Sequence, residues 1–268
     1  MVSPPGASRV QSEDILIGNR WDTTIAFISR EMPTMPETYV DALMVDDGMD
    51  ERTFFALNGC PYAFMKAMRQ FAKAAAVFKQ TPLAHDSLDM QQVDELVAYL
   101  KGWANEYTTS LEEVEASDED PEDRIDRFHT VEAWRCSVLL YSRRVFRSHQ
   151  DAAGLRVIQH LSRTVLDHIR CIRVTQMMQK QVLLPVFLAA VETADEDSRC
   201  FVRRYCKHWS TTARYSQFET ALTLIENIWV SYEVNDRADY WWGCEVGSHT
   251  WSGEHDGGPG LEQELLLG

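Results

Sequence analysis

Apolar residues recur every third or fourth position along most of the chain, a period typical of amphipathic α-helices. One such segment follows Pro61, whose ring fits the first turn of a helix because a missing N–H costs nothing there. The next segment begins after the turn residues Pro82 to Ser87. The apolar positions of the two segments are Phe64, Met68, Phe71, Ala75 and Phe78, and then Met90, Val93, Val97, Leu100 and Ala104. The pattern predicts two amphipathic helices, each of which buries one face.

The same period continues in the second half of the chain and predicts further helices around a central one. Leu183 to Val191 is apolar nearly all round, which is typical of a buried helix with Pro185 in its first turn. The apolar positions of the other segments are Val131, Trp134, Val138, Tyr141 and Val145; Ile158, Leu161, Val165, Ile169 and Ile172; Phe201, Val202, Tyr205 and Trp209; and Phe218, Leu222, Ile225 and Trp229. No strand alternation of useful length occurs. We predict an all-α fold, a single multi-helix domain of packed helical hairpins with an irregular C-terminal tail.

The two ends of the chain do not show this period. Prolines and glycines interrupt the start, so we expect residues 1–50 to form an irregular N-terminal segment. Residues 51–232 carry the helical pattern and form the predicted domain. Residues 233–268 are rich in glycine, acidic residues and tryptophan, and we expect their rings to pack on the helical body while the glycines make turns.

The charge balance changes the expected partners. The 268 residues contain 26 Lys and Arg against 41 Asp and Glu, so the net charge is −15 at pH 7. Because binding to phosphates needs a concentrated cationic surface, we expect no direct contact with nucleic acid. The first residues lack the pattern of a signal peptide, and the longest apolar stretch is about half the length that a bilayer requires. The sequence therefore predicts a soluble intracellular protein without membrane contact.

No residue pattern specifies a metal or a reaction. The six cysteines form no CxxC pair and no zinc-finger spacing, so we expect reduced, buried or incidental thiols. Asp46 to Asp50 fits the letters of an aspartate-rich diphosphate–magnesium motif, but Gly48 interrupts it and the segment has a poor helical period. The only partner run, Asn235 to Asp239, has Gly243 where its last ligand should fall. We interpret Asp46 to Asp50 as an exposed turn and predict no metal site, no cofactor and no catalytic constellation.

The arginines are concentrated in one part of the chain. Eight of them, and no lysine, lie between Arg135 and Arg173, at positions 135, 143, 144, 147, 156, 163, 170 and 173. Leu111 to Asp123 contains eight acidic residues and no basic one, which is typical of a solvated loop, although a functional acidic face is the alternative. A nucleic-acid patch is one interpretation of the arginines. We favour pairing with the acidic loop, with the acidic tail or with another protein, because the arginines interleave with apolar positions.

Four stretches resemble the regulatory, or middle homology, domain of fungal-specific zinc-cluster transcription factors. They are Phe54 to Pro61, Glu132 to Arg135 with Leu140 and Tyr141, Leu183 to Ala190 with Glu192, and Asp195 to Arg199. The similarity continues through Ala221, Leu222 and Ile225 to Trp229. No six-cysteine cluster precedes these stretches, so we expect the zinc-cluster DNA-binding module to be absent. The resemblance implies a helical module that regulates transcription in the nucleus, and some relatives that sense sterols bind a hydrophobic ligand in this domain.

Three functions follow from these observations. The first is a transcription regulator that acts through a protein partner or as a homodimer. The second is a sensor of a hydrophobic small molecule. The third is an enzyme of fungal specialised (secondary) metabolism that reuses the scaffold to convert an apolar substrate, and a cytoplasmic location is the alternative to the nucleus.

A hydrophobic ligand would need a cavity lined by large side chains. We expect one between the central helix and its neighbours, covered by the aromatic tail, with Tyr141 as its polar group. The alternative is that the same rings complete the core. The predicted ligand-binding residues are Trp134, Tyr141, Met177, Phe187, Trp229, Trp241 and Trp242, with Met178 and Trp251 nearby.

Overall fold

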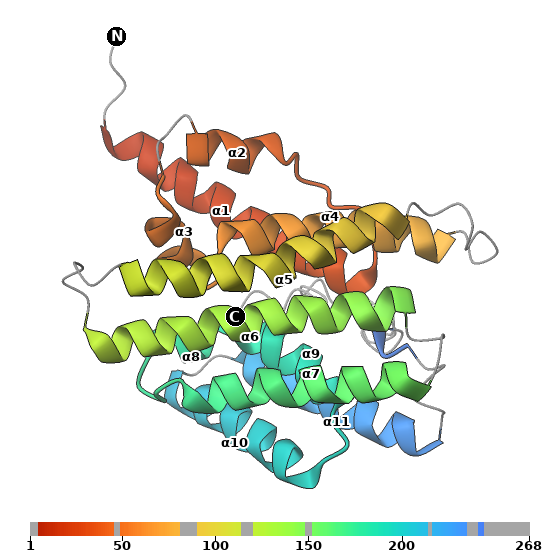
Figure 1. The fold of residues 1–268 in the computed structure, drawn as a ribbon. Helices are drawn as coiled ribbons and strands as arrows, with labels where there is room; N and C mark the ends of the chain where they lie inside the picture. The colour runs from red at the N-terminus through yellow and green to blue at the C-terminus, as the bar shows by residue number, and fades with distance from the viewer. Residues whose placement is uncertain are drawn as a thin grey trace, which may run out of the picture. The chain divides into compact units, whose positions relative to one another are not determined.

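Helices account for all the regular structure that can be described in this chain (Figure 1). The computed structural model describes residues 5–45, 49–80, 90–113, 120–147, 152–213, 216–234 and 241–243. The helices are α1 (Pro5–Ser29), α2 (Thr38–Val45), α3 (Glu51–Asn58), α4 (Tyr62–Gln80), α5 (Met90–Glu113), α6 (Pro121–Arg147), α7 (Ala152–Cys171), α8 (Met177–Gln181), α9 (Leu183–Glu192), α10 (Glu196–Ala213) and α11 (Ser216–Val234). The predicted all-α class is confirmed. Contacts divide the chain into two compact units, residues 1–88 and 89–268.

The first unit corrects the expected irregular start of the chain. Residues 5–29 and 38–45 are helical, and α1 packs against α2, α3 and α4. Leu16 and Phe27 of α1 are buried together with the predicted stripe of α4, of which Phe64 and Phe71 are fully buried. The sequence concealed α1 because its buried face also carries polar residues, Asn19, Thr23 and Thr24.

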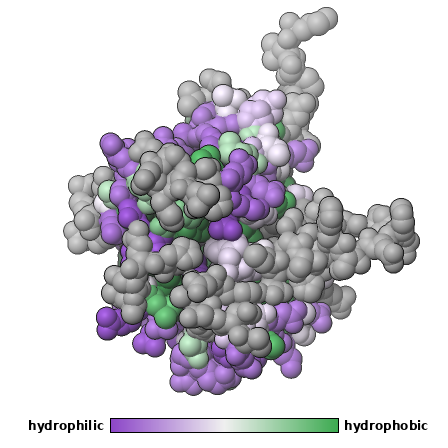
Figure 2. All heavy atoms as spheres, turned by 90° about the vertical axis from the view of Figure 1, so that its right-hand side faces the viewer, coloured by the Kyte–Doolittle hydropathy of each residue, from purple (hydrophilic) through white to green (hydrophobic). Residues whose placement is uncertain are grey.

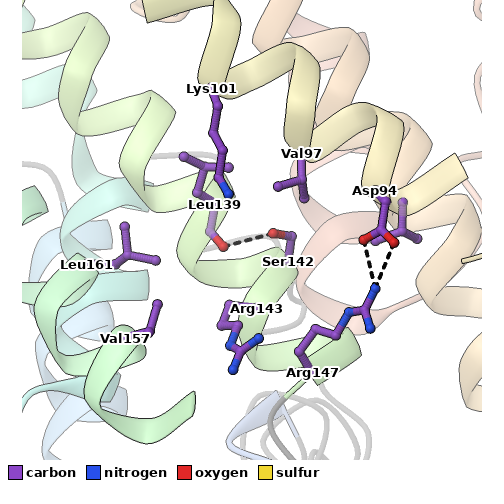
Figure 3. Close-up of a pocket in the computed structure, with 10 residues that line it drawn as sticks. Asp94, Val97, Lys101, Leu139, Ser142, Arg143, Arg147, Val157 and Leu161 are labelled. Atoms are coloured by element: carbon purple, nitrogen blue, oxygen red, sulfur yellow. Dashed lines mark hydrogen bonds and ion pairs between the residues drawn. The ribbon is translucent and has the colours of Figure 1, made fainter. Parts of the chain in front are cut away.

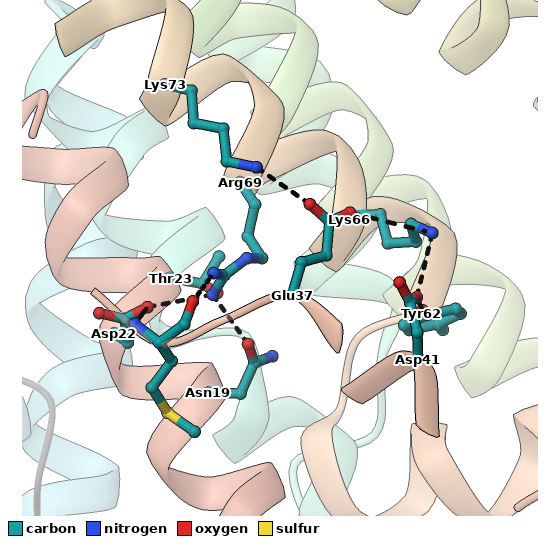
Figure 4. Close-up of polar contacts among 10 residues, drawn as sticks. Asn19, Asp22, Thr23, Glu37, Asp41, Tyr62, Lys66, Arg69 and Lys73 are labelled. Atoms are coloured by element: carbon teal, nitrogen blue, oxygen red, sulfur yellow. Dashed lines mark hydrogen bonds and ion pairs between the residues drawn. The ribbon is translucent and has the colours of Figure 1, made fainter. Parts of the chain in front are cut away.

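Arg69 of α4 explains why polar residues are buried on α1 (Figure 4). Its Nη1 donates to Asn19 Oδ1 at 2.8 Å, to Asp22 Oδ2 at 3.0 Å and to Thr23 Oγ1 at 3.2 Å. Its Nη2 donates to the carbonyl of Met35, in the connection between α1 and α2. One guanidinium that is only 3% exposed therefore joins two helices and a loop. The buried face of α1 is therefore held by hydrogen bonds to Arg69 as well as by apolar packing, and a search for apolar periodicity does not detect such a face.

The stretch Phe54 to Pro61, the first of the four that resemble the fungal regulatory domain, forms most of α3 and its connection to α4. Asp50 is the N-cap of α3, and its carboxylate accepts from the backbone N–H of Thr53 at 2.7 Å. This bond lowers the pKa of Asp50. Gly59 ends α3 with φ 65°, and its N–H donates to the carbonyl of Phe55 at 2.7 Å. Asp50 thus has a structural role at a helix start, while residues 46–48 of the aspartate run lie outside the described residues.

The second unit is built around α9, as the apolar run predicts. Pro185 to Glu192 are all buried, and α9 packs against α6, α7, α10 and α11. The last carbonyls of a helix lack partners within the helix, and burying them bare would be costly. Ser162 Oγ of α7 donates to the carbonyl of Ala189 at 2.7 Å, and Trp229 Nε1 of α11 donates to that of Ala190 at 2.8 Å. Side chains of α7 and α11 therefore supply the hydrogen-bond donors that the last carbonyls of α9 need.

A buried ion pair lies at the same end of α9. Arg144 Nε of α6 is 3.1 Å from Glu192 Oε1, and the two side chains are 3% and 2% exposed. Trp242 Nε1 donates to the same carboxylate oxygen at 3.0 Å, and its ring packs edge-on against Phe187. The described part of the tail, residues 241–243, is thereby held on α9, while residues 235–240 and 244–268, with Trp251, lie outside the described residues.

The arginine cluster pairs within the chain. Arg173 contacts Glu122, Asp123 and Asp126 in the first turns of α6, with a distance of 2.5 Å from its Nε to Asp126 Oδ2. Pairing with the acidic segment is thus confirmed for Arg173. The segment is a loop only in part, because Leu111 to Glu113 belongs to α5 and Pro121 to Asp123 opens α6. The acids at the start of α6 also suit the positive end of its dipole.

On the face drawn in Figure 2, charged and polar side chains cover much of the described surface, with apolar ones between them. Within the described segments, every helix is too short or too polar to span a bilayer.

Candidate functional site

A groove of about 440 Å³ lies between α5, α6 and α7 in the second unit (Figure 3). Its lining residues are Val93, Asp94, Val97, Lys101, Leu139, Ser142, Arg143, Arg147, Val157 and Leu161. Small-molecule sites in proteins usually measure about 300–1,000 Å³, so the groove has the size of such a site.

Each helix contributes one stripe at helical spacing. Val93, Val97 and Lys101 follow one another at four-residue intervals on α5, so they lie on one face. Val157 and Leu161 stand in the same relation on α7. The helix α6 packs against both α5 and α7 and lies between the two stripes, and Figure 3 shows its side chains between them. The amphipathic period therefore supplies the stripes, and the packing of the three helices forms the groove between them.

The floor of the groove is apolar and its rim is cationic. Val93 and Leu139 are 2% and 7% exposed, whereas Val157 remains 44% exposed. Lys101, Arg143 and Arg147 line the groove with a single acidic residue, Asp94. Three cations against one anion give a local excess of positive charge in a chain whose net charge is −15.

The polar contacts of the groove favour binding over chemistry. Arg147 Nη2 donates to both carboxylate oxygens of Asp94, at 2.7 and 2.9 Å (Figure 3). Ser142 Oγ donates to the carbonyl of Leu139 at 2.8 Å, one turn back along α6. Since that hydroxyl is held by its own helix, it is not placed next to a base that would make it a nucleophile.

The ligand-binding residues predicted from the sequence do not line the groove. Four of them form a ring cluster elsewhere in the second unit. Trp241 and Trp242 stack with centroids 4.5 Å apart, Trp242 meets Phe187 at 5.4 Å, and Trp241 meets Tyr141 at 6.4 Å. Trp242 and Tyr141 are 1% and 0% exposed, so the rings fill this part of the unit. Their role in ligand binding stays a prediction.

The other three predicted residues belong to α6, α8 and α11. Trp134 and Trp229 are buried on α6 and α11, as expected of core residues, whereas Met177 on α8 is 57% exposed. The indole Nε1 of Trp134 has no hydrogen-bond partner among the described residues. A function for these three residues in ligand binding also stays a prediction.

The sequence contained a partial signal for the groove. Arg143 and Arg147 belong to the arginine cluster, but nothing in the period of α6 places them in one groove with Lys101 of α5. That juxtaposition depends on how α5 and α6 pack, so Asp94, Lys101 and the apolar floor were not anticipated as a site.

A histidine pair, His129 and His168, joins α6 and α7 roughly 20 Å along α6 from Ser142. Their Nδ1 atoms are 2.9 Å apart, so one ring donates to the other and at least one is neutral. Burial lowers the pKa of both rings, and for His168 the neighbouring His129 lowers it further. No group of three His, Cys, Asp or Glu side chains in the described segments could hold a metal ion.

The described cysteines do not form disulfides. Cys60, Cys136 and Cys206 are buried, and Cys171 and Cys200 are exposed. Burial raises the pKa of Cys136 to about 11 and that of Cys206 to about 12. Since the thiolate is the nucleophile, these two buried thiols are poorly suited to covalent catalysis at neutral pH.

Comparison with known protein families assigns the chain to one family. The fungal specific transcription factor domain matches residues 20–252, which include the C-terminal part of α1, the whole of α2 to α11 and the described tryptophans of the tail. The chain belongs to the fungal specific transcription factor domain family. The match also covers α2 and the end of α1, which the sequence patterns missed. No curated protein and no solved structure matches the chain in the corresponding comparisons.

Proposed function

We propose that this chain is the regulatory module of a fungal transcription regulator, that it works in the nucleus, and that it acts by binding another molecule. The observation that carries the proposal is the family match over residues 20–252, which spans both units. The groove between α5, α6 and α7 supports the binding role, because it combines an apolar floor with a charged rim.

Under this proposal, these 268 residues do not bind DNA directly. The net charge of −15 opposes phosphate binding, and at least five of the eight clustered arginines already contact acidic side chains in the described segments. In titrations with labelled duplex DNA at near-physiological salt, we expect no sequence-dependent binding. Nanomolar, sequence-dependent binding would overturn this part of the proposal.

A reporter experiment tests the regulatory role. The full chain is fused to a heterologous DNA-binding domain and a fluorescent tag in a fungal host that carries a matching reporter gene. We expect nuclear fluorescence and a reporter output that differs from that of the DNA-binding domain alone. A second fusion without the DNA-binding domain shows whether the chain enters the nucleus by itself. Exclusion from the nucleus together with unchanged reporter output would refute the proposal.

A further inference from the structure

We propose that the groove between α5, α6 and α7 binds a small amphipathic carboxylate, with its apolar part on the floor and its carboxylate at Arg147. This inference rests on the proposed function, in which the module acts by binding another molecule, and it names the chemical class of that molecule for this groove.

The floor selects an apolar body. Val97, Leu139 and Leu161, one from each of the three helices, face the space, and Val157 stands at its edge with 44% of its surface exposed. Covering these side chains with hydrocarbon removes apolar surface from water, which favours binding in proportion to the area buried. A small polar anion alone would leave this surface wet.

The rim selects a negative head. A neutral ligand that filled the groove would take water from Lys101, Arg143 and Arg147 without offering them a new anion, and that desolvation costs free energy. A ligand with one anionic group offsets this cost through a charge-assisted hydrogen bond. Lys101, two turns along α5 from Asp94, has no ion-pair partner among the described residues and adds to the positive charge of the groove.

The groove already holds a carboxylate, which identifies the head group. Asp94 presents both of its oxygens to Nη2 of Arg147. The Asp94 side chain is 61% exposed, whereas that of Arg147 is 29% exposed. Asp94 can therefore turn into water at small cost and leave Arg147 in place for the ligand. A ligand carboxylate would replace an existing carboxylate, so Asp94 is a built-in competitor for the site.

This competition gives two variants with opposite effects. Asp94→Asn removes the competing charge and is expected to tighten binding of the acid several-fold. Arg147→Gln removes the cation that receives the head group and is expected to weaken binding by about tenfold or more, since a charge-assisted hydrogen bond is lost. The matched control is Arg170→Gln, which breaks the exposed ion pair between Arg170 and Asp167 on α7. We expect it to leave the affinity for the acid unchanged.

The test is a fluorescence titration of the purified full chain with parinaric acid, a polyene fatty acid, and with its methyl ester. We expect saturable binding of the acid at one site and at least roughly tenfold weaker binding of the ester, which has the same body without the charge. Equal affinity for acid and ester, or an Arg147→Gln variant that binds the acid like the original chain, would overturn the proposal. Tighter binding of a matched alkyl phosphate would overturn the assignment of a carboxylate.

The result can be separated from that of the reporter experiment. If the acid does not bind while the reporter still responds to the chain, the ligand class is wrong and the regulatory role stands. If the acid binds as described while the chain stays out of the nucleus, the site stands and the proposed function is wrong.

Discussion

Replacing Arg69 with methionine tests the polar cluster that joins α1 and α4. Met keeps an unbranched chain of similar length but removes the guanidinium, which is only 3% exposed. The change leaves Asn19 Oδ1, Asp22 Oδ2 and the carbonyl of Met35 without their common donor. We expect the helices of the first unit, and not those of the second, to lose protection against hydrogen exchange.

The magnitude follows from the contacts. Removing one partner of a buried ion pair typically costs about 3–5 kcal/mol, because the other charge stays buried. Burial raises the pKa of Asp22, but hydrogen bonds from Thr34, Met35 and Arg69 together hold it below the usual value. Those from Thr34 and Met35 remain in the variant. These remaining bonds place the expected cost near the lower limit, at about 3 kcal/mol. Since about 1.4 kcal/mol is a factor of ten, protection against exchange should fall roughly 100-fold.

Hydrogen exchange followed by mass spectrometry measures this locally. Peptides from α1 and α4 should exchange roughly 100-fold faster in Arg69→Met, while peptides from α7 and α9 provide the internal reference. Asp22→Asn is the matched variant, because it removes the charge and leaves an oxygen for Arg69 to donate to; we expect a smaller effect. An acceleration below about tenfold in α1 and α4 would refute the reasoning, because it would show that the cluster is not a main tie between these helices.

Three further predictions concern the second unit. Burial holds the pKa values of the histidine pair below 6.5, so the folded protein binds fewer protons than the unfolded chain. Denaturant titrations should therefore show that the free energy of unfolding falls as the pH drops from about 7.5 to about 5.5. The fall should be less steep in His168→Asn. Glu192→Gln removes the carboxylate partner of Arg144 and should cost about 3 kcal/mol in the same assay, whereas Trp242→Phe, which loses one hydrogen bond, should cost about 1 kcal/mol. Trp229→Ala should cost about 3–5 kcal/mol in thermal melts, and Trp229→Phe clearly less.

Each of these has an outcome that contradicts it. A pH profile that His168→Asn leaves unchanged would mean that other groups carry the acid sensitivity. Equal losses in Glu192→Gln and Trp242→Phe would mean that the ion pair contributes little beyond the indole hydrogen bond. Unchanged melting of Trp229→Ala would mean that α11 does not depend on its contact with the end of α9.

The order of the helices followed from the sequence wherever the buried face is purely apolar. The spacing of Phe64, Met68 and Phe71 predicted α4, and the unbroken apolar run of Leu183 to Val191 predicted the central position of α9. The reason is that a period of 3.6 residues places such side chains on one face, and water drives that face inward without reference to any particular partner.

Only the tertiary structure decided where polar groups are buried or brought together. The face of α1 carries Asn19 and Thr23, and these make sense only with Arg69, some fifty residues away in the sequence. Lys101 and Arg147 line one groove because α5 and α6 pack together, and no local period encodes that arrangement. Hydrophobic burial can be read from one segment at a time, whereas a hydrogen bond or an ion pair needs two groups at a defined distance. The sequence alone therefore determined the helical class, and the packing of separate helices against one another created the candidate site.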